Sequence, residues 1–334
     1  MKTHIPILVA IGLALGACKP AAPQPGVASS APLIRVGANC WPGNYWIDIA
    51  HTQGWFKEAG LNVEWVDTNA DFFASLHDLA SGKLDLAVFS FYDFVSFNAQ
   101  GKDLVGVIAC DYSSGVDALV ARRGIESVRG LAGKKLALPK GTYLESLFNR
   151  AAERAGLDPT TVTIVDVLLE KVHEEFIAGR ADAMFAAEPF VSEGVAKGDG
   201  AIIFSTKEAV GIEGGIGTLR RQFVQERPAD VQALLAVWNR TTEFIKTQPD
   251  EAFAIVATVN KKTLDEVKAF AANDKILDLR ENRTAFTYAA GLDSLHGSLR
   301  EISDYLVRRG LATKKVDSTE VLDDRFLRAL PVKP

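Results

Sequence analysis

The stretch LIRVGANCWPGNYWIDIAHTQGWFKEAGLNVEWVD, residues 33–67, decides the fold. Residues 34–38 are a short apolar run typical of a buried strand, and residues 45–59 carry helical periodicity that stops at Gly60. Residues 62–67 are the next strand candidate. A strand, a helix and a second strand in this order predict the first unit of an α/β fold.

The alternation of strand and helix continues to about residue 220. Further strands are expected at residues 84–89, 105–110, 118–121, 135–138, 162–167, 183–186, 201–205 and 216–219. Helices are expected at residues 71–79, 93–98, 142–155, 172–177 and 190–196, and then at 229–247, 250–259, 263–271 and 283–309. This order predicts mostly parallel sheets with helices on both faces, followed by a helical C-terminal third with little strand signal.

The composition is that of an ordinary globular protein. The 334 residues are 48% hydrophobic and 24% charged, and the length is enough for two domains. The 37 Lys and Arg stand against 42 Asp and Glu, a net charge of −5, with no long basic run. A polyanionic partner such as nucleic acid is therefore disfavoured.

The N-terminus reads as a targeting segment. Residues 1–17 place Lys2 before an apolar run that is too short to span a bilayer, which is typical of a signal peptide. The stretch Leu15-Gly16-Ala17-Cys18 resembles the lipobox of bacterial lipoproteins, which implies cleavage before Cys18 and a lipid on its thiol. The alternative is plain secretion with cleavage nearby.

Residues 18–32 are rich in Pro, Ala and Ser, so we expect a flexible tether and no core. The protein would then sit in the periplasm, anchored to the inner or the outer membrane through the lipid on Cys18. The residue after Cys18 is Lys19 and not the Asp that resembles an inner-membrane retention signal. The choice between the inner and the outer membrane nevertheless stays open.

Two further cysteines, Cys40 and Cys110, each end a predicted strand, and both a disulfide and two buried free thiols fit. No Cys/His cluster has zinc-ligand spacing, so we expect neither a metal nor another cofactor. Hydrolase, metalloprotease and nucleotide-binding motifs are absent from the sequence. These observations disfavour an enzyme.

Several motifs resemble one family of transport proteins. Trp41-Pro42-Gly43 followed by residues 54–64, GWFKEAGLNVE, resembles the opening of the nitrate/sulfonate/taurine and pyrimidine-precursor substrate-binding proteins (SsuA/THI5-like, NMT1-like). Residues 79–85, 111–118 and 176–183 resemble later signatures of that family, and Glu188-Pro189 matches its "E-P" pair. Each motif is weak alone, but the four occur in the family's order.

The resemblance implies a type II periplasmic-binding-protein fold, in which two Rossmann-like α/β lobes are joined by two crossover hinge segments. We place the crossovers near residues 116–122 and 215–220. The first lobe is then residues 33–117 plus 220–334, and the second lobe is residues 118–219.

The resemblance also implies partners. Such a protein binds a small-molecule solute and delivers it to an ABC permease and ATPase, and we expect a monomer. A lipid-anchored sensor that reports the ligand to a signalling partner is an alternative. One branch of the family is a pyrimidine-synthase-like enzyme, but its cysteine-rich iron motif is absent here.

Ligands of open α/β sheets lie beyond the carboxyl ends of the strands. The side chains that the sequence predicts there are Trp41, Asn44, Tyr45, Asn69, Ser90, Asp93, Asp111, Tyr112, Thr142, Tyr143, Glu188 and Glu213. Aromatic rings could stack on a planar ligand, and hydroxyls at helix N-termini could hold polar groups. Packing of Trp41 and ordinary helix capping by Ser90 and Thr142 are the alternatives.

These loops hold several acids and few basic residues, of which Lys140 is the clearest. A buried carboxylate needs a donor or a cation, from the protein or from the ligand. The pattern favours a solute that carries an amine or an amino-heterocycle. A sulfonate, taurine or nitrate anion is the alternative.

Overall fold

The computed structural model describes Met1, residues 31–208 and residues 213–331. The predicted signal peptide apart from Met1, the Cys18 that is predicted to carry a lipid, and most of the predicted tether lie outside the described residues. Within these described ranges, no helix is long and apolar enough to cross a membrane.

The first lobe is built on a five-stranded sheet in the order β2-β1-β3-β11-β4. Its strands are β1 (Leu33–Ala38), β2 (Asn62–Asp67), β3 (Leu86–Ser90), β4 (Leu104–Ala109) and β11 (Gly215–Arg220). β1 runs parallel to β2 and β3, whereas β11 runs antiparallel to β3 and β4. Every residue of β3 and β4 is buried, because helices cover both faces of the sheet.

Helices from the N-terminal half cover the two sides of this sheet. On one side, α1 (Tyr45–Thr52) and α2 (Trp55–Glu58) pack on β2. On the other, α3 (Ala74–Ser81) packs on β3, and α4 (Phe91–Ala99) packs on β3, β4 and β11.

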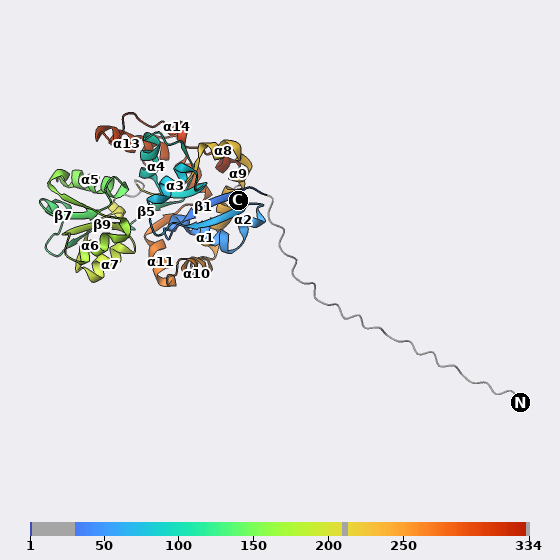
Figure 1. Ribbon diagram of the computed structural model, residues 1–334, viewed down its shortest axis with the longest axis horizontal. Helices are drawn as coiled ribbons and strands as arrows, with labels where there is room; N and C mark the ends of the chain where they lie inside the picture. Colours follow the sequence, from blue (N-terminus) through green and yellow to red (C-terminus); the bar gives the residue numbers. More distant parts are fainter. Residues whose placement is uncertain (2–30, 209–212, 332–334) are drawn as a thin grey trace.

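The second lobe has its own five-stranded sheet, in the order β10-β6-β9-β7-β8. Its strands are β6 (Asp117–Arg122), β7 (Lys135–Leu138), β8 (Thr163–Asp166), β9 (Ala183–Ala187) and β10 (Gly200–Ser205). Its helices are α5 (Tyr143–Ala155), α6 (Val172–Ile177) and α7 (Phe190–Lys197). Figure 1 shows this lobe in green beside the blue and orange elements of the first lobe.

The chain passes between the lobes twice. On the way out, β5 (Asp111–Ser113) pairs with β12 (Asp274–Ile276) in a two-stranded antiparallel sheet, and residues 114–116 then lead into β6. The return follows β10 and ends at β11. The crossovers predicted at residues 116–122 and 215–220 are therefore misplaced, because these apolar runs are the strands β6 and β11 inside the two sheets.

The C-terminal third is helical, as predicted, and returns to the first lobe. It comprises α8 (Arg221–Glu226), α9 (Pro228–Thr247), α10 (Pro249–Val259), α11 (Leu264–Ala272), α12 (Leu279–Ala285), α13 (Leu295–Arg308), α14 (Ser318–Val321) and α15 (Arg325–Ala329). In it, α9 and α10 pack on α1, whereas α13 packs on α4.

The structure differs from the sequence expectations in two helices and in the direction of several strands. The helix expected at residues 45–59 is split into α1 and α2, because Gly54 between them takes a left-handed backbone with φ of 71°. The helix expected at residues 283–309 is likewise two helices, α12 and α13. The sheets are less parallel than predicted, since β6, β10 and β11 run antiparallel to their neighbours.

Candidate functional site

Two sheet edges meet between the lobes. In the first sheet the C-terminal end of β3 lies beside the start of β11, because Ser90 pairs with Gly215. In the second sheet the C-terminal end of β9 lies beside the start of β6, because Asp117 pairs with Ala187. The loops that leave these edges carry the polar side chains of the site.

The fully buried carboxylate of Asp111 fixes the first-lobe wall. Its Oδ2 accepts a hydrogen bond of 2.6 Å from Nε1 of Trp41, and its Oδ1 accepts one of 2.8 Å from the backbone N–H of Gly215. A Cβ atom on Gly43 or on Gly215 would overlap this carboxylate. Glycine in the Trp-Pro-Gly motif therefore lets the backbone approach Asp111 closely.

A second buried carboxyl, that of Asp274, lies against Asp111. The β5–β12 pairing puts Asp274 opposite Ser113, which makes Asp274 a diagonal neighbour of Asp111. Burial and the charge of Asp111 raise the pKa of Asp274 well above its usual range. Burial raises the pKa of Asp111 as well, but the hydrogen bond between the two carboxyls opposes this rise, so we assign the shared proton to Asp274 and the acceptor role to Asp111.

A polar network at the crossing joins the lobes. The carboxylate of Asp117, at the start of β6, accepts hydrogen bonds from the Ser113 hydroxyl at 2.6 Å and from the Tyr143 hydroxyl at 3.0 Å. The Thr206 hydroxyl lies 2.7 Å from that of Ser113 and accepts the backbone N–H of Gly115. Burial raises the pKa of Asp117 to about 7.

Asp93 connects the N-terminus of α4 to the N-terminus of α5. Its carboxylate accepts the Ser90 hydroxyl at 2.7 Å and a hydrogen bond from the backbone of Tyr143 in the other lobe. Burial raises the pKa of Asp93 to about 7, against the opposing effect of these two donors.

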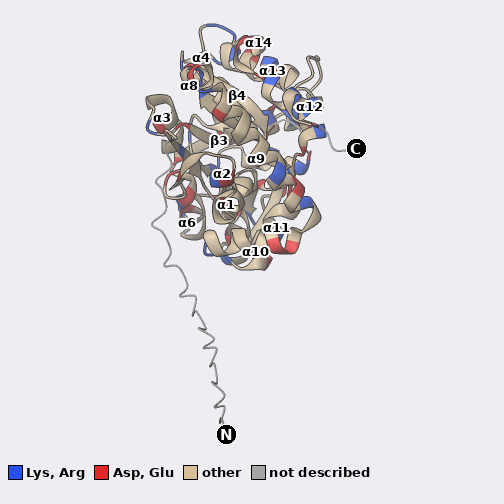
Figure 2. Ribbon diagram, turned by 90° about the vertical axis from the view of Figure 1, so that its right-hand side faces the viewer, with Lys and Arg blue, Asp and Glu red and all other residues tan. Residues whose placement is uncertain are grey.

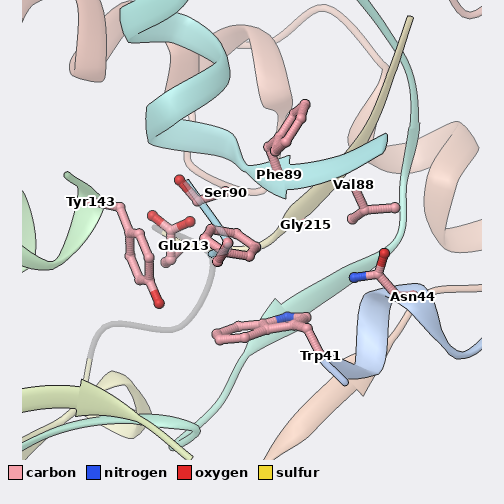
Figure 3. A pocket seen from close by; sticks show the side chains of 10 residues that line it. Trp41, Asn44, Val88, Phe89, Ser90, Tyr143, Glu213 and Gly215 are labelled. Atoms are coloured by element: carbon pink, nitrogen blue, oxygen red, sulfur yellow. The ribbon is translucent and has the colours of Figure 1, made fainter. Parts of the chain in front are cut away.

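A pocket lies between these groups (Figure 3). Its walls are Trp41, Asn44, Phe72, Val88, Phe89, Ser90, Tyr143, Glu213, Gly214 and Gly215. The rings of Trp41 and Tyr143 meet edge to face with centroids 6.4 Å apart. The free space is about 270 Å³, but the centre of a water molecule fits into only about 10 Å³ of it, so the lobes are nearly closed.

Two acceptor atoms of this pocket have no donor from the described protein. One is Oε1 of Glu213, and the other is Oδ1 of Asn44, whose amide nitrogen donates to Asn39 at 3.0 Å. Burial and the charges of Asp117 and Asp93 raise the pKa of Glu213 well above its usual range. Figure 3 shows the Glu213 carboxyl beside Ser90 and the ring of Tyr143.

Among the predicted site residues, the structure brings seven together. Five line the pocket: Trp41, Asn44, Ser90, Tyr143 and Glu213. Asp93 and Asp111 lie directly behind this wall, bonded to Ser90 and Trp41 respectively.

Three predicted site residues are used elsewhere. Tyr45 is fully buried, and its ring packs edge-on against Phe253 of α10. Tyr112 lies on β5 opposite Lys275 of β12, outside the pocket. The Thr142 hydroxyl caps α5 through the N–H of Leu144 and donates to a backbone carbonyl, as the capping alternative expects.

The last two, Asn69 and Glu188, line a neighbouring cavity. Oδ1 of Asn69 accepts the backbone N–H of Cys40 at 2.8 Å. The Glu188 carboxylate accepts both the backbone N–H and the hydroxyl of Ser192. Both side chains are thus already engaged within their own lobes.

The sequence missed several residues of the site. Three apolar side chains line the pocket although the sequence pattern indicates only core positions or loop flanks for them: Phe72, Val88 and Phe89. Asp117 lies at the head of an apolar strand, where the pattern gave only a strand boundary. Asp274 belongs to β12, a strand of three residues that is too short for its periodicity to show.

The charges around the site are one-sided. None of the described residues in the pocket wall is Lys, Arg or His, and Lys140 is exposed.

No group of three His, Cys, Asp or Glu among the described residues could hold a metal ion. Both Cys40 and Cys110 are free thiols. On the face shown in Figure 2, acidic and basic segments are interspersed, unlike the one-signed surface that suits a polyanion.

Two α/β lobes, crossed twice by the chain and closed on a shared pocket, define a periplasmic-binding-protein fold of the solute-binding class. The family described as NMT1/THI5 like matches residues 45–252, which is more than half of the chain. The chain belongs to this family, and it is a binding protein and not an enzyme.

Curated relatives cover most of the chain at low identity. A protein of Bacillus subtilis strain 168 named as an aliphatic sulfonates-binding protein is 25% identical over 290 residues, which are 84% of this chain and 83% of that protein. A protein of Escherichia coli K12 with the same description is 24% identical over 257 residues, covering 76% and 77%.

Solved structures agree on the fold. The periplasmic aliphatic sulphonate binding protein SsuA from Escherichia coli superposes with a TM-score of 0.72 at 18% identity, covering 88% of this chain and 93% of that chain. The periplasmic nitrate-binding protein NrtA from Synechocystis PCC 6803 gives a TM-score of 0.70 at 13% identity, covering 90% and 89%.

Proposed function

We propose that this chain is the lipid-anchored periplasmic receptor of an ABC importer and that its solute carries an amine or an amino-heterocycle. The observation that supports this ligand class is the pair of buried acceptors, Glu213 Oε1 and Asn44 Oδ1, which belong to residues of one pocket wall and have no donor among the described residues. A buried acceptor without a donor costs about 1–3 kcal/mol, and a ligand N–H group removes that cost.

The aromatic walls support a flat ligand. Trp41 and Tyr143 come from different lobes and meet edge to face at the pocket, so a ring that packs against both side chains contacts both lobes at once. A ligand that binds both lobes favours the closed arrangement by its differential affinity. The importer then takes the solute from the closed receptor.

A sulfonate or nitrate is the second candidate, because the relatives and structural neighbours are named for aliphatic sulfonates or nitrate. Such an anion offers only acceptors to a wall whose free groups are also acceptors. It would also lie beside the buried carboxyl of Glu213, with those of Asp93 and Asp117 close behind, and no cation of the described wall balances the charge of the anion.

The test is a thermal-shift and calorimetric panel on the full-length protein. We expect stabilisation by 4-amino-5-methylpyrimidine or by small primary amines, and none by butanesulfonate or nitrate, neither of which has an N–H donor. Tight binding of a sulfonate together with no binding of any amine or aminopyrimidine would overturn the proposed ligand class.

The anchor and the importer need separate tests. Metabolic labelling with a fatty acid should mark the wild type and not Cys18→Ser, and labelling of that variant would contradict the lipid anchor. Deletion of the gene should abolish solute uptake. Unchanged uptake together with a lost transcriptional response to the solute would favour the sensor alternative.

A further inference from the structure

A second cavity continues the pocket outward. It has about 470 Å³ of space between its walls, open solvent included, and it shares two walls with the inner pocket, Trp41 and Phe72. Its other walls include Cys40, Asn69, Leu169, Glu170, Phe190 and Phe270. We call it the outer chamber, and the pocket around Glu213 the inner pocket.

The outer chamber is made by both lobes. Cys40, Asn69 and Phe72 come from loops of the first lobe, whereas Glu170 and Phe190 come from the second. The backbone N–H of Phe72 donates to Oε1 of Glu170 across the gap at 3.2 Å. The chamber is therefore complete only when the lobes close, and whatever fills it stabilises the closed form.

Phe270 of α11 is the clearest sign that the outer chamber holds an apolar group. Its side chain is only 6% exposed, yet Phe270 does not belong to the continuous apolar core of the described residues. Phe270 instead lines both the outer chamber and the hollow next to it. Together with Trp41, Phe72 and Phe190, it gives the outer chamber four aromatic walls.

The outer chamber also opens toward the surface. It shares Glu188 and Phe270 with a third hollow between α7 and α11, whose rim carries the exposed residues Lys197 and Glu266. A solute with its head in the inner pocket could thus extend past Trp41 and Phe72 without leaving the cleft.

We infer that the solute is a two-part molecule, with a hydrogen-bond-donating head in the inner pocket and a flat apolar group in the outer chamber. This inference rests on the proposed function for the head and adds the second part. The apolar group touches both lobes, so it should contribute to affinity through closure as well as through its own burial.

The test compares two probes by calorimetry on the full-length protein: 4-amino-5-methylpyrimidine and 4-amino-5-benzylpyrimidine. We expect the benzyl compound to bind on the order of ten-fold more tightly or better, because it buries a phenyl ring in the outer chamber. Phe270→Ala should abolish most of this gain while the methyl compound binds as before.

Two further variants make the result decisive. Phe190→Ala removes a partly exposed wall of the outer chamber and should also reduce the gain, even if Phe270→Ala folds poorly. Tyr288→Ala removes an aromatic ring that is 67% exposed and lines neither cavity, so it should keep the full gain.

The outcomes separate the two proposals. Equal binding of the two probes, or a gain that survives both Phe270→Ala and Phe190→Ala, overturns the outer-chamber assignment and leaves the proposed function standing. Binding of neither probe, with binding of a sulfonate, overturns the proposed function and this inference together.

Discussion

Trp41 and Asp111 hold one another at the wall of the pocket, with the indole Nε1–H donating to Oδ2 of the carboxylate at 2.6 Å. They are 70 residues apart in the chain. Asp111 also accepts the N–H of Gly215 at the start of the return strand β11. One carboxylate thus positions an aromatic wall and the strand that follows Glu213.

Asp111→Asn should therefore weaken both stability and binding. The two carboxylate oxygens of Asp111 each accept one N–H, whereas an Asn side chain has only one acceptor oxygen. Its NH2 group would therefore face either the indole N–H of Trp41 or the backbone N–H of Gly215, which are both donors. We expect a loss of about 1–3 kcal/mol in the free energy of unfolding, measured by chemical denaturation, and weaker solute binding.

Asp274→Asn is the matched control. Its amide can donate to Asp111 in place of the proton that the two carboxyls share, so stability and affinity should stay close to the wild type. Equal damage from both substitutions would contradict the assignment of the proton to Asp274.

Glu213→Gln should reduce affinity for an amine or aminopyrimidine by about ten-fold or more, because the N–H groups of the bound ligand oppose the burial that raises the Glu213 pKa and so favour a charged acceptor, which an amide cannot provide. The measurement is calorimetric titration. Glu188→Gln is the control, since Ser192 already engages that carboxylate outside the inner pocket. Unchanged affinity in Glu213→Gln would remove Glu213 from ligand recognition.

Asp117 should make part of the stability depend on pH. Burial raises its pKa to about 7, well above the value of about 4 in an unfolded chain. The folded state then holds more protons between these values, so the contribution of Asp117 is full below about pH 4 and is lost as the pH rises through about 7.

The variant Asp117→Asn has no such titration. Relative to the wild type, it should therefore gain stability as the pH rises from about 4 to about 7, on the order of 1 kcal/mol or more. Denaturation curves at several pH values measure this difference. If the stability of Asp117→Asn relative to the wild type stays constant or falls over that range, Asp117 is already ionised in the folded protein.

A contact outside both cavities holds the lobes together. The amide of Asn149 on α5 donates to the hydroxyl of Tyr305 on α13 at 2.9 Å, and Arg150 pairs with Glu301 at 3.3 Å beside it. Tyr305→Phe should favour the open form and raise the solute Kd by about two- to ten-fold.

Small-angle scattering and calorimetry measure the two effects of Tyr305→Phe. Tyr288→Phe makes the same chemical change at an exposed ring and should alter neither. An unchanged Kd in Tyr305→Phe would mean that this bond does not bias closure.

Most of the fold could be predicted from the sequence, because buried strands are short apolar runs and helices end at glycines. The strand β7 and the helix α6 match their predicted ranges, residues 135–138 and 172–177. The order of strands within each sheet could not be predicted in this way. The antiparallel orientation of β6 and β11 depends on where the chain crosses between the lobes, and these crossings have no local pattern in the sequence.

The site could be predicted only in part. Trp41 and Glu213 follow from their places in loops at the sheet edge, where open α/β sheets bind ligands. Tyr45 follows the loop that carries Trp41, but Tyr45 is the first residue of α1, and there its side chain packs into the core against Phe253. The outer chamber depends on Phe270, which comes from α11 and has no sequence signal to separate it from a core residue.

Gly214 and Gly215 follow Glu213 directly, at the point where the chain re-enters the first sheet. If Glu213 binds the solute as proposed, the recognising side chain is attached to the segment by which the chain returns from the second lobe to the first. A substitution at Glu213 should then be measured for its effect on lobe closure as well as on affinity.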